Sequence, residues 1–170
     1  MSQRKHLPFA LSLLLSLVNL TIMPLFSTSV SARPKPLAGP IPAFVERVVD
    51  GDTLLVRARI WLGQELRVMV RLSGVDAPEM RARCDTEREM ARSARYFVKR
   101  LVGQRKIMLS HIRQGKYAGR VIAEVRDSNG SSLSAQLLKA RLARPYRRGR
   151  RKSWCTRAFT RSYEKVQIAR

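Results

Sequence analysis

Three segments of alternating apolar and polar residues follow one another between residues 43 and 72. Residues 43–49, 53–62 and 65–72 show the period of two that is typical of β-strands. The turns between them are Asp50-Gly51-Asp52 and Gly63-Gln64. The residues expected to share the apolar face of the third segment are Leu66, Val68, Val70 and Leu72. This pattern predicts three consecutive strands at the start of the folded domain.

The second half of the chain predicts a helix, two strands and two more helices. Apolar residues recur at spacings of three and four within residues 85–102, which indicates a helix with one buried face. Asp85-Thr86 can cap this helix, and Gly103 ends it. We expect strands at 106–112 and 121–125, a hairpin turn at 127–130, and helices at 133–140 and 156–169.

Five short strands with a helix between the third and the fourth follow the plan of an OB barrel. We therefore predict a β-rich α+β domain, a five-stranded OB-fold barrel with about three helices. That fold binds oligonucleotides on one face, but a fold alone does not establish a function.

The N-terminal residues have the pattern of a secretory leader. Arg4, Lys5 and His6 precede an apolar stretch at 7–26, and Val30-Ser31-Ala32 is a typical cleavage site. We expect a signal peptide at residues 1–32, a proline-rich linker at 33–42 and a domain at 43–170. This predicts export to the periplasm or the medium. The alternative is an uncleaved leader that anchors the chain in a membrane.

The chain has two cysteines, Cys84 and Cys155. Two cysteines in an exported protein pair more often than they stay free, so we predict a disulfide between them. It would contribute on the order of 4 kcal/mol to stability in the chain-entropy model. The alternative is two separate buried thiols.

The net charge directs attention to acidic ligands. The chain has 34 lysines and arginines against 12 acidic residues, a formal net charge of +22. Nucleic acid is the first partner to consider, and an anionic membrane surface is the competing interpretation. Only His111 remains after removal of the leader, so catalysis by a pair of histidines is excluded. The densest basic run lies at 147–152, and we interpret it as a phosphate-binding rim, the alternative being a solubilising tail.

Four carboxylates lie in two turn-like motifs at strand ends: Asp50 and Asp52 in the first, Asp76 and Glu79 in the second. Each motif alone is typical of an ordinary turn or loop. Together, at the ends of adjacent strands, they offer the oxygen ligands that suit a hard cation such as Ca²⁺.

Three blocks resemble the staphylococcal nuclease (thermonuclease) family. They are Val49-Asp-Gly-Asp-Thr53, Arg71-Leu-Ser-Gly-Val-Asp-Ala-Pro-Glu79 and Lys116-Tyr-Ala-Gly-Arg-Val-Ile-Ala123. The resemblance covers residues 43–155, and it is specific because the three blocks occur together and in order. It implies an OB barrel and Ca²⁺-dependent hydrolysis of phosphodiester bonds in DNA and RNA.

The resemblance also implies roles for single residues. Asp52 and Asp76 match the calcium carboxylates, and Ala77 supplies a main-chain carbonyl to the metal where threonine is common. Glu79 matches the carboxylate that activates or orients water, and Arg71 and Arg120 match the phosphate-binding arginines. The expected nucleic-acid-binding residues are Lys116, Tyr117, Tyr146, Arg147 and Arg148.

Two departures from the family pattern lie beside Arg120. Ala118-Gly119 stands where the staphylococcal pattern has a single glycine, and Gly115 stands where aspartate is usual. An added residue can move the guanidinium by a few ångströms, enough to change the rate.

The first hypothesis is thus an exported, monomeric, Ca²⁺-dependent nuclease with little sequence preference and no obligate protein partner. The second is an OB-fold nucleic-acid-binding protein with impaired catalysis. A cationic membrane-surface protein is the third, and it explains the charge but not the motifs.

Overall fold

The computed structural model describes residues 35–103, 106–147 and 149–156. The predicted signal peptide, Arg148 and nearly all of the predicted helix at 156–169 lie outside these residues. No helix within the described residues is long and apolar enough to cross a membrane.

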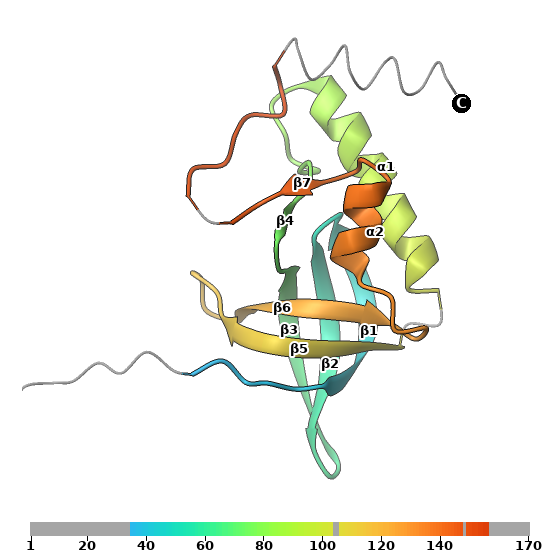
Figure 1. The fold of residues 1–170 in the computed structure, drawn as a ribbon, viewed down its shortest axis with the longest axis vertical. Helices are drawn as coiled ribbons and strands as arrows, with labels where there is room; N and C mark the ends of the chain where they lie inside the picture. The colour runs from blue at the N-terminus through green and yellow to red at the C-terminus, as the bar shows by residue number, and fades with distance from the viewer. Residues whose placement is uncertain (1–34, 104–105, 148, 157–170) are drawn as a thin grey trace, which may run out of the picture. The chain divides into compact units, whose positions relative to one another are not determined.

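Five strands close into one barrel (Figure 1). They are β1 (Ile41–Asp50), β2 (Thr53–Trp61), β3 (Gln64–Leu72), β5 (Lys106–Gln114) and β6 (Arg120–Asp127). Their order around the barrel is β1-β2-β3-β6-β5. All neighbours are antiparallel except β3 and β6, which run parallel. This closed barrel confirms the predicted β-rich α+β class and is consistent with the OB fold.

Two helices occur in the described part of the chain, α1 (Asp85–Leu101) and α2 (Leu133–Lys139), where about three were expected. They contact each other, α1 contacts β1, and α2 contacts β6 (Figure 1). The apolar stripe predicted for α1 is confirmed: Met90, Ala94 and Val98 are buried. Ala94 and Val98 share one core with Val56 of β2 and Val70 of β3. Helix α1 begins after Cys84, and Ser132 caps α2 through a hydrogen bond from the Ala135 amide.

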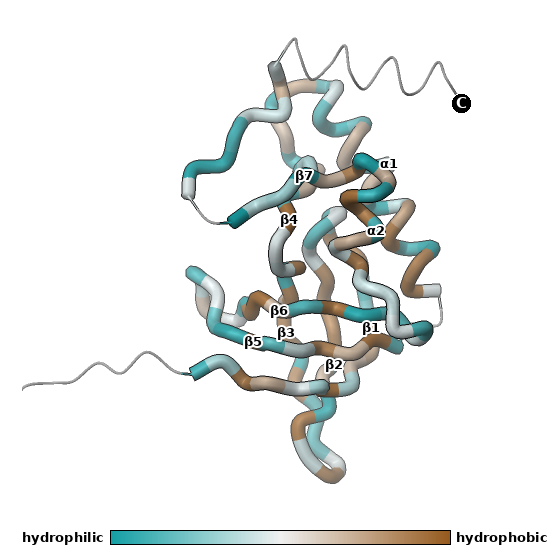
Figure 2. Tube along the Cα trace, in the orientation of Figure 1, coloured by the Kyte–Doolittle hydropathy of each residue, from teal (hydrophilic) through white to brown (hydrophobic). Residues whose placement is uncertain are grey.

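The β2–β3 hairpin departs from the predicted alternation. Val70 and Leu72 are buried as expected, but Leu66 is 49% exposed. Near the tip, Trp61 and Leu62 are 70% and 88% exposed, and Figure 2 shows apolar residues there. The hairpin extends past its neighbours, so its outer end has no sheet to pack against.

Two boundaries also differ from expectation. Strand β1 begins at Ile41, and Leu37 exchanges two backbone hydrogen bonds of 2.8 Å with Ile112. The second half of the predicted linker therefore takes part in the strand pairing of the barrel. The turn at 127–130 connects β6 to α2 rather than two long strands, and a single bridge between Arg126 and Ser132 flanks it.

A second, two-stranded sheet has no counterpart in the prediction. Strands β4 (Val75–Asp76) and β7 (Arg144–Pro145) are antiparallel, with Asp76 opposite Arg144. Two-residue strands have no periodicity to detect. This small sheet brings the C-terminal segment to the second carboxylate motif.

Candidate active site

Three neighbouring strands place the site residues. Thr53, which begins β2, pairs with Arg71 of β3, and Arg120, which begins β6, pairs with Met69 on the other side of β3. Asp52 directly precedes β2. The strand pairing therefore brings the three sequence blocks together at the same part of the barrel.

A pocket of about 540 Å³ lies at this place. It is lined by the three predicted catalytic residues, Arg71, Glu79 and Arg120. The other lining residues are Arg47, Val49, Asp50, Thr53, Met80, Arg81 and Arg95. Five arginines against two carboxylates give the pocket an excess of positive charge, which suits a polyanion.

The glycine of the first motif allows the site to pack closely. A Cβ atom at Gly51 would lie 2.7 Å from Cβ of Ala94 and 3.0 Å from Cβ of Ala77. Helix α1 thus packs against the first carboxylate motif through Ala94, and the second motif packs against the first through Ala77. This explains why alanine at position 77 fits its neighbours.

Asp52 is 2% exposed, and its carboxylate accepts three hydrogen bonds. Its Oδ1 atom accepts from Arg71 Nη1 and Thr53 Oγ1, each at 2.9 Å, and its Oδ2 atom accepts from the Ala77 amide at 2.8 Å. Burial raises the pKa of Asp52, and the charge of Arg71 and the hydrogen bonds offset this only in part.

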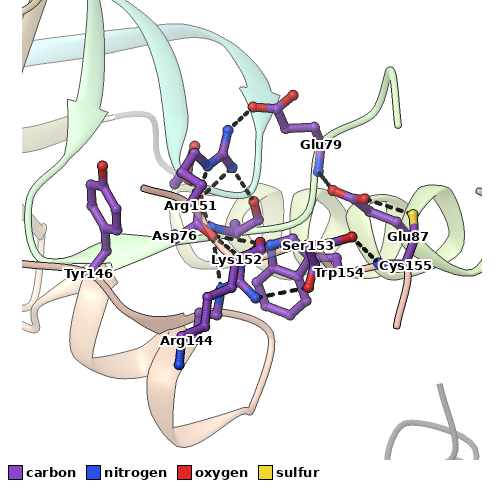
Figure 3. Close-up of polar contacts among 12 residues, drawn as sticks. Asp76, Glu79, Glu87, Arg144, Tyr146, Arg151, Lys152, Ser153, Trp154 and Cys155 are labelled. Carbon is purple, nitrogen blue, oxygen red and sulfur yellow. Dashed lines mark hydrogen bonds and ion pairs between the residues drawn. The ribbon is translucent and has the colours of Figure 1, made fainter. Parts of the chain in front are cut away.

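Asp76 has no exposed surface and accepts from several donors (Figure 3). Its Oδ2 atom accepts from Arg144 Nε at 3.0 Å and from the Trp154 indole at 3.1 Å. The Arg144 guanidinium also stacks 4.2 Å from the centre of the Trp154 ring. Arg71 Nη2 lies 3.4 Å from the Oδ1 atom of Asp76, so one guanidinium spans both aspartates.

Arg151 contacts the three groups of the second motif (Figure 3). Its Nε atom lies 2.5 Å from Asp76 Oδ1, its Nη2 atom donates to the Ala77 carbonyl at 3.2 Å, and its Nη1 atom donates to Glu79 Oε1. Burial lowers the pKa of Arg151, but the hydrogen bond to Glu79 and the charge of Asp76 outweigh it and raise the pKa. The Arg151 side chain therefore keeps its positive charge.

The loop before Arg120 requires its glycine at position 115. The Gly115 amide donates to the Arg120 carbonyl at 2.9 Å, and a Cβ atom at Gly115 would lie 2.7 Å from that carbonyl oxygen. Gly119 has a φ of +72°, which suits glycine. With these two glycines the longer loop still brings Arg120 to the pocket that contains Arg71.

None of the predicted nucleic-acid-binding residues that the structure describes lines the pocket. Lys116 and Tyr117 are exposed and lie near Arg120 in the chain. Lys116 Nζ and Arg120 Cζ each lie 5.6 Å from the centre of the Tyr117 ring. Tyr146 is partly buried, and its hydroxyl donates to the Gly149 carbonyl at 2.8 Å, so it organises the loop. Arg147 is exposed. Arg148 lies outside the described residues.

A disulfide joins Cys84 and Cys155, which are 71 positions apart, with 6.0 Å between their Cα atoms. It attaches the segment that contains Arg151 and Trp154 to the start of α1. Glu87 lies beside both sulfurs, and in the described residues these three form the one close group of Cys, His, Asp or Glu ligand atoms. Because the sulfurs are bonded to each other, this group has no thiolate to offer a metal.

The donors at the two aspartates fit a hard divalent cation. Asp52 and Asp76 are buried carboxylates, and the Ala77 carbonyl shares the Arg151 guanidinium with Asp76. Ca²⁺ takes carboxylate and carbonyl oxygens as ligands. Glu79 is 49% exposed at its side chain and faces Arg151. It suits a water-activating role better than that of a buried ligand.

Sequence reasoning missed three residues of the site: Arg144, Arg151 and Trp154. Trp154 is buried, and its indole donates a hydrogen bond to Asp76. Arg151 lies within the basic run interpreted as a phosphate-binding rim, yet its side chain turns toward the acids. Only their nearness to Cys155, and so to the start of α1, offered a signal.

Comparison with protein families gives one match. The family model described as staphylococcal nuclease homologue matches residues 69–168. The matched range contains Arg71, Asp76, Glu79 and Arg120, and the match confirms the resemblance that the three blocks indicated. No curated protein matches the chain.

Proposed function

The chain belongs to the staphylococcal nuclease homologue family, and on this premise we propose that it is a Ca²⁺-dependent nuclease. We propose that it hydrolyses phosphodiester bonds of DNA, RNA or both with little sequence preference, and that it acts as a monomer after export. The disulfide between Cys84 and Cys155 supports an oxidising compartment such as the periplasm or the medium.

One observation carries the nuclease proposal: Arg71, Glu79 and Arg120 line the same pocket, although 49 positions separate the first from the last. Among the charged groups of this pocket, a phosphodiester would meet the guanidinium groups of Arg71 in β3 and Arg120 in β6 and the carboxylate of Glu79. These are the groups that bind phosphoryl oxygens and accept a proton from water.

The arginines and Glu79 divide the chemistry between them. Arg120 donates paired hydrogen bonds to the phosphoryl oxygens, and Arg71, which also donates to Asp52 and Asp76, adds its positive charge and its remaining N–H donors. These interactions strengthen as negative charge builds in the transition state. Glu79 accepts the proton of the attacking water. A guanidinium is a poor proton donor, so the role of Arg120 is to bind the negative charge of the phosphate. Bound at Asp52, Asp76 and the Ala77 carbonyl, Ca²⁺ would supply further neutralisation of the phosphate.

A zymogram tests this proposal directly. Purified protein is run in gels that contain DNA or RNA, and the gels are developed with Ca²⁺ or with chelator. Clearing that needs Ca²⁺ and disappears in Arg120→Gln supports a Ca²⁺-dependent nuclease. Clearing of equal strength with chelator would support a nuclease whose activity does not depend on a metal.

One observation favours a second candidate, a nucleic-acid-binding protein with impaired catalysis. Arg151 binds Asp76, Ala77 and Glu79 together, so the second motif is engaged by a protein side chain. This candidate predicts retention of DNA in a mobility-shift assay and no clearing in either gel at any Ca²⁺ concentration.

A further inference from the structure

The contacts of Arg151 overlap with the expected metal site. One guanidinium binds a carboxylate oxygen of Asp76, the carbonyl oxygen of Ala77 and a carboxylate oxygen of Glu79. The first two are oxygens that the proposed function assigns to Ca²⁺. A metal ion and this guanidinium therefore need the same lone pairs.

The charges at the site balance with the arginine in place. Three carboxylates, of Asp52, Asp76 and Glu79, face three guanidinium groups, of Arg71, Arg144 and Arg151. A divalent cation added to this set would leave two excess positive charges in a largely buried place. Because like charges at short range repel, binding of the cation favours the departure of a guanidinium from this set.

Arg151 is the arginine best placed to leave. The side chains of Arg71 and Arg144 are 17% and 20% exposed, against 35% for Arg151. Arg71 belongs to a barrel strand, while Arg144 belongs to β7 and stacks on Trp154. Arg151 lies in a segment without regular secondary structure.

The segment is attached to the domain on the C-terminal side of Arg151. Trp154 is 2% exposed and binds Asp76, and Cys155 is bonded to Cys84. The guanidinium can thus rotate away from the acids while its backbone stays attached beside them. The competitor is therefore always present at high local concentration.

Building on the proposed function, we propose that Arg151 is a built-in competitor of Ca²⁺. The acidic site holds either the Arg151 guanidinium or the divalent cation. Binding of the cation frees Glu79 from its ion pair, so metal binding and release of the water-activating carboxylate are one event. Arg151 thereby sets the Ca²⁺ concentration at which the site becomes complete.

The test measures Ca²⁺ binding rather than activity. Metal-stripped full-length protein is titrated with CaCl₂ by calorimetry, as wild type, Arg151→Gln, Arg151→Lys and Arg150→Gln. Arg150 is exposed and next in the chain, so its variant removes the same charge from outside the site. We expect Arg151→Gln to lower the Kd for Ca²⁺ by about tenfold or more, since charges this close interact strongly even when partly screened. Arg150→Gln should leave the Kd within about twofold, because an exposed charge at a greater distance is screened.

Arg151→Lys keeps the charge but loses the fork that reaches three oxygens, so its Kd should lie between those of wild type and Arg151→Gln. A Trp61→Phe background leaves Trp154 as the one tryptophan, and its fluorescence reports the site independently. Thermal melting checks that each variant is folded.

An unchanged or raised Kd in folded Arg151→Gln would overturn the proposal, because Arg151 would then be neutral toward the metal or help to bind it. Absence of Ca²⁺ binding in all four proteins would overturn it too. Whether the wild type cleaves DNA is measured separately in the zymogram. The calorimetry can therefore disprove the competition without disproving the nuclease proposal. Conversely, a protein that does not cleave DNA can still show competition between Arg151 and Ca²⁺.

Discussion

The Nε atom of Arg144 lies 3.0 Å from Oδ2 of Asp76, although 68 positions separate the two residues. The backbones of the same residues pair in the β4–β7 sheet. Asp76, at the centre of the second carboxylate motif, is thus held by the C-terminal segment as well as by the barrel. Four side chains compensate one fully buried carboxylate, and two of them, Arg151 and Trp154, come from the ten residues after β7.

Arg144→Gln should destabilise the fold. Breaking a buried ion pair by removal of one partner costs about 3–5 kcal/mol, and the remaining donors to Asp76 should keep the loss near the lower end of this range. Urea unfolding followed by circular dichroism measures it. Arg147→Gln, an exposed arginine three positions on, should change stability by less than about 0.5 kcal/mol. Equal stabilities of the two variants would show that Arg144 is dispensable to Asp76.

Glu79→Gln and Asp52→Asn should fail in different ways. Glutamine keeps the size of Glu79 but accepts no proton at neutral pH, so kcat should fall by about 10²–10⁴ at saturating Ca²⁺. Asparagine at position 52 removes charge from the proposed metal site, so activity should require more Ca²⁺ and recover in part at high concentration. Steady-state rates across a Ca²⁺ series separate the two. Near wild-type turnover in Glu79→Gln would remove this residue from the mechanism.

Gly115→Ala should displace Arg120. The new Cβ atom would lie 2.7 Å from the Arg120 carbonyl oxygen, so the loop has to shift. A displacement of about 1 Å at a catalytic group can cost about 10² in rate. We expect kcat/KM to fall by about 10–100-fold, with less than a few degrees' change in melting temperature. Ala118→Ser, at an exposed position of the same loop, is the control and should keep wild-type kcat/KM.

Arg81→Gln should weaken binding of nucleic acid and its dependence on salt. Arg81 lines the pocket with Arg71 and Arg120, whereas Arg83 is exposed and does not line it. Each phosphate contact contributes about 0.7–0.9 to the slope of log K against log salt concentration. Fluorescence anisotropy with labelled DNA in Ca²⁺-free buffer should show the slope reduced by about this amount in Arg81→Gln. The slope for Arg83→Gln should stay at the wild-type value, and identical slopes in both variants would place the phosphate contacts elsewhere.

Opening the disulfide should loosen the segment that contains Trp154. Loss of a disulfide in a small secreted domain costs about 2–5 kcal/mol. The double variant Cys84→Ser/Cys155→Ser should therefore unfold at lower urea concentration, and in a Trp61→Phe background the fluorescence of Trp154 should shift to longer wavelength. A reduced wild-type protein with unaltered midpoint and emission would show that the contacts of Trp154 and Arg144 hold the segment unaided.

The alternation of apolar and polar residues was enough to predict the five barrel strands and the face of α1, because burial on one side imposes its period on the sequence. The three motifs indicated the family for a similar reason: the chemistry of phosphate binding requires those residue types at those spacings. The outer end of the β2–β3 hairpin is more exposed than predicted. Alternation indicates that a segment is a strand, but it does not show whether another element covers that strand.

Tertiary structure alone decided what surrounds Asp76. Strands β4 and β7 are two residues each, too short to show a period in the sequence. They pair although 68 positions separate Asp76 from Arg144. The inward turn of Arg151 depends on the path between β7 and the disulfide. In the sequence Arg147, Arg150 and Arg151 are alike, and one basic run predicts one basic surface. Only the fold distinguishes them, because it brings a single guanidinium of the three within hydrogen-bonding distance of buried carboxylates.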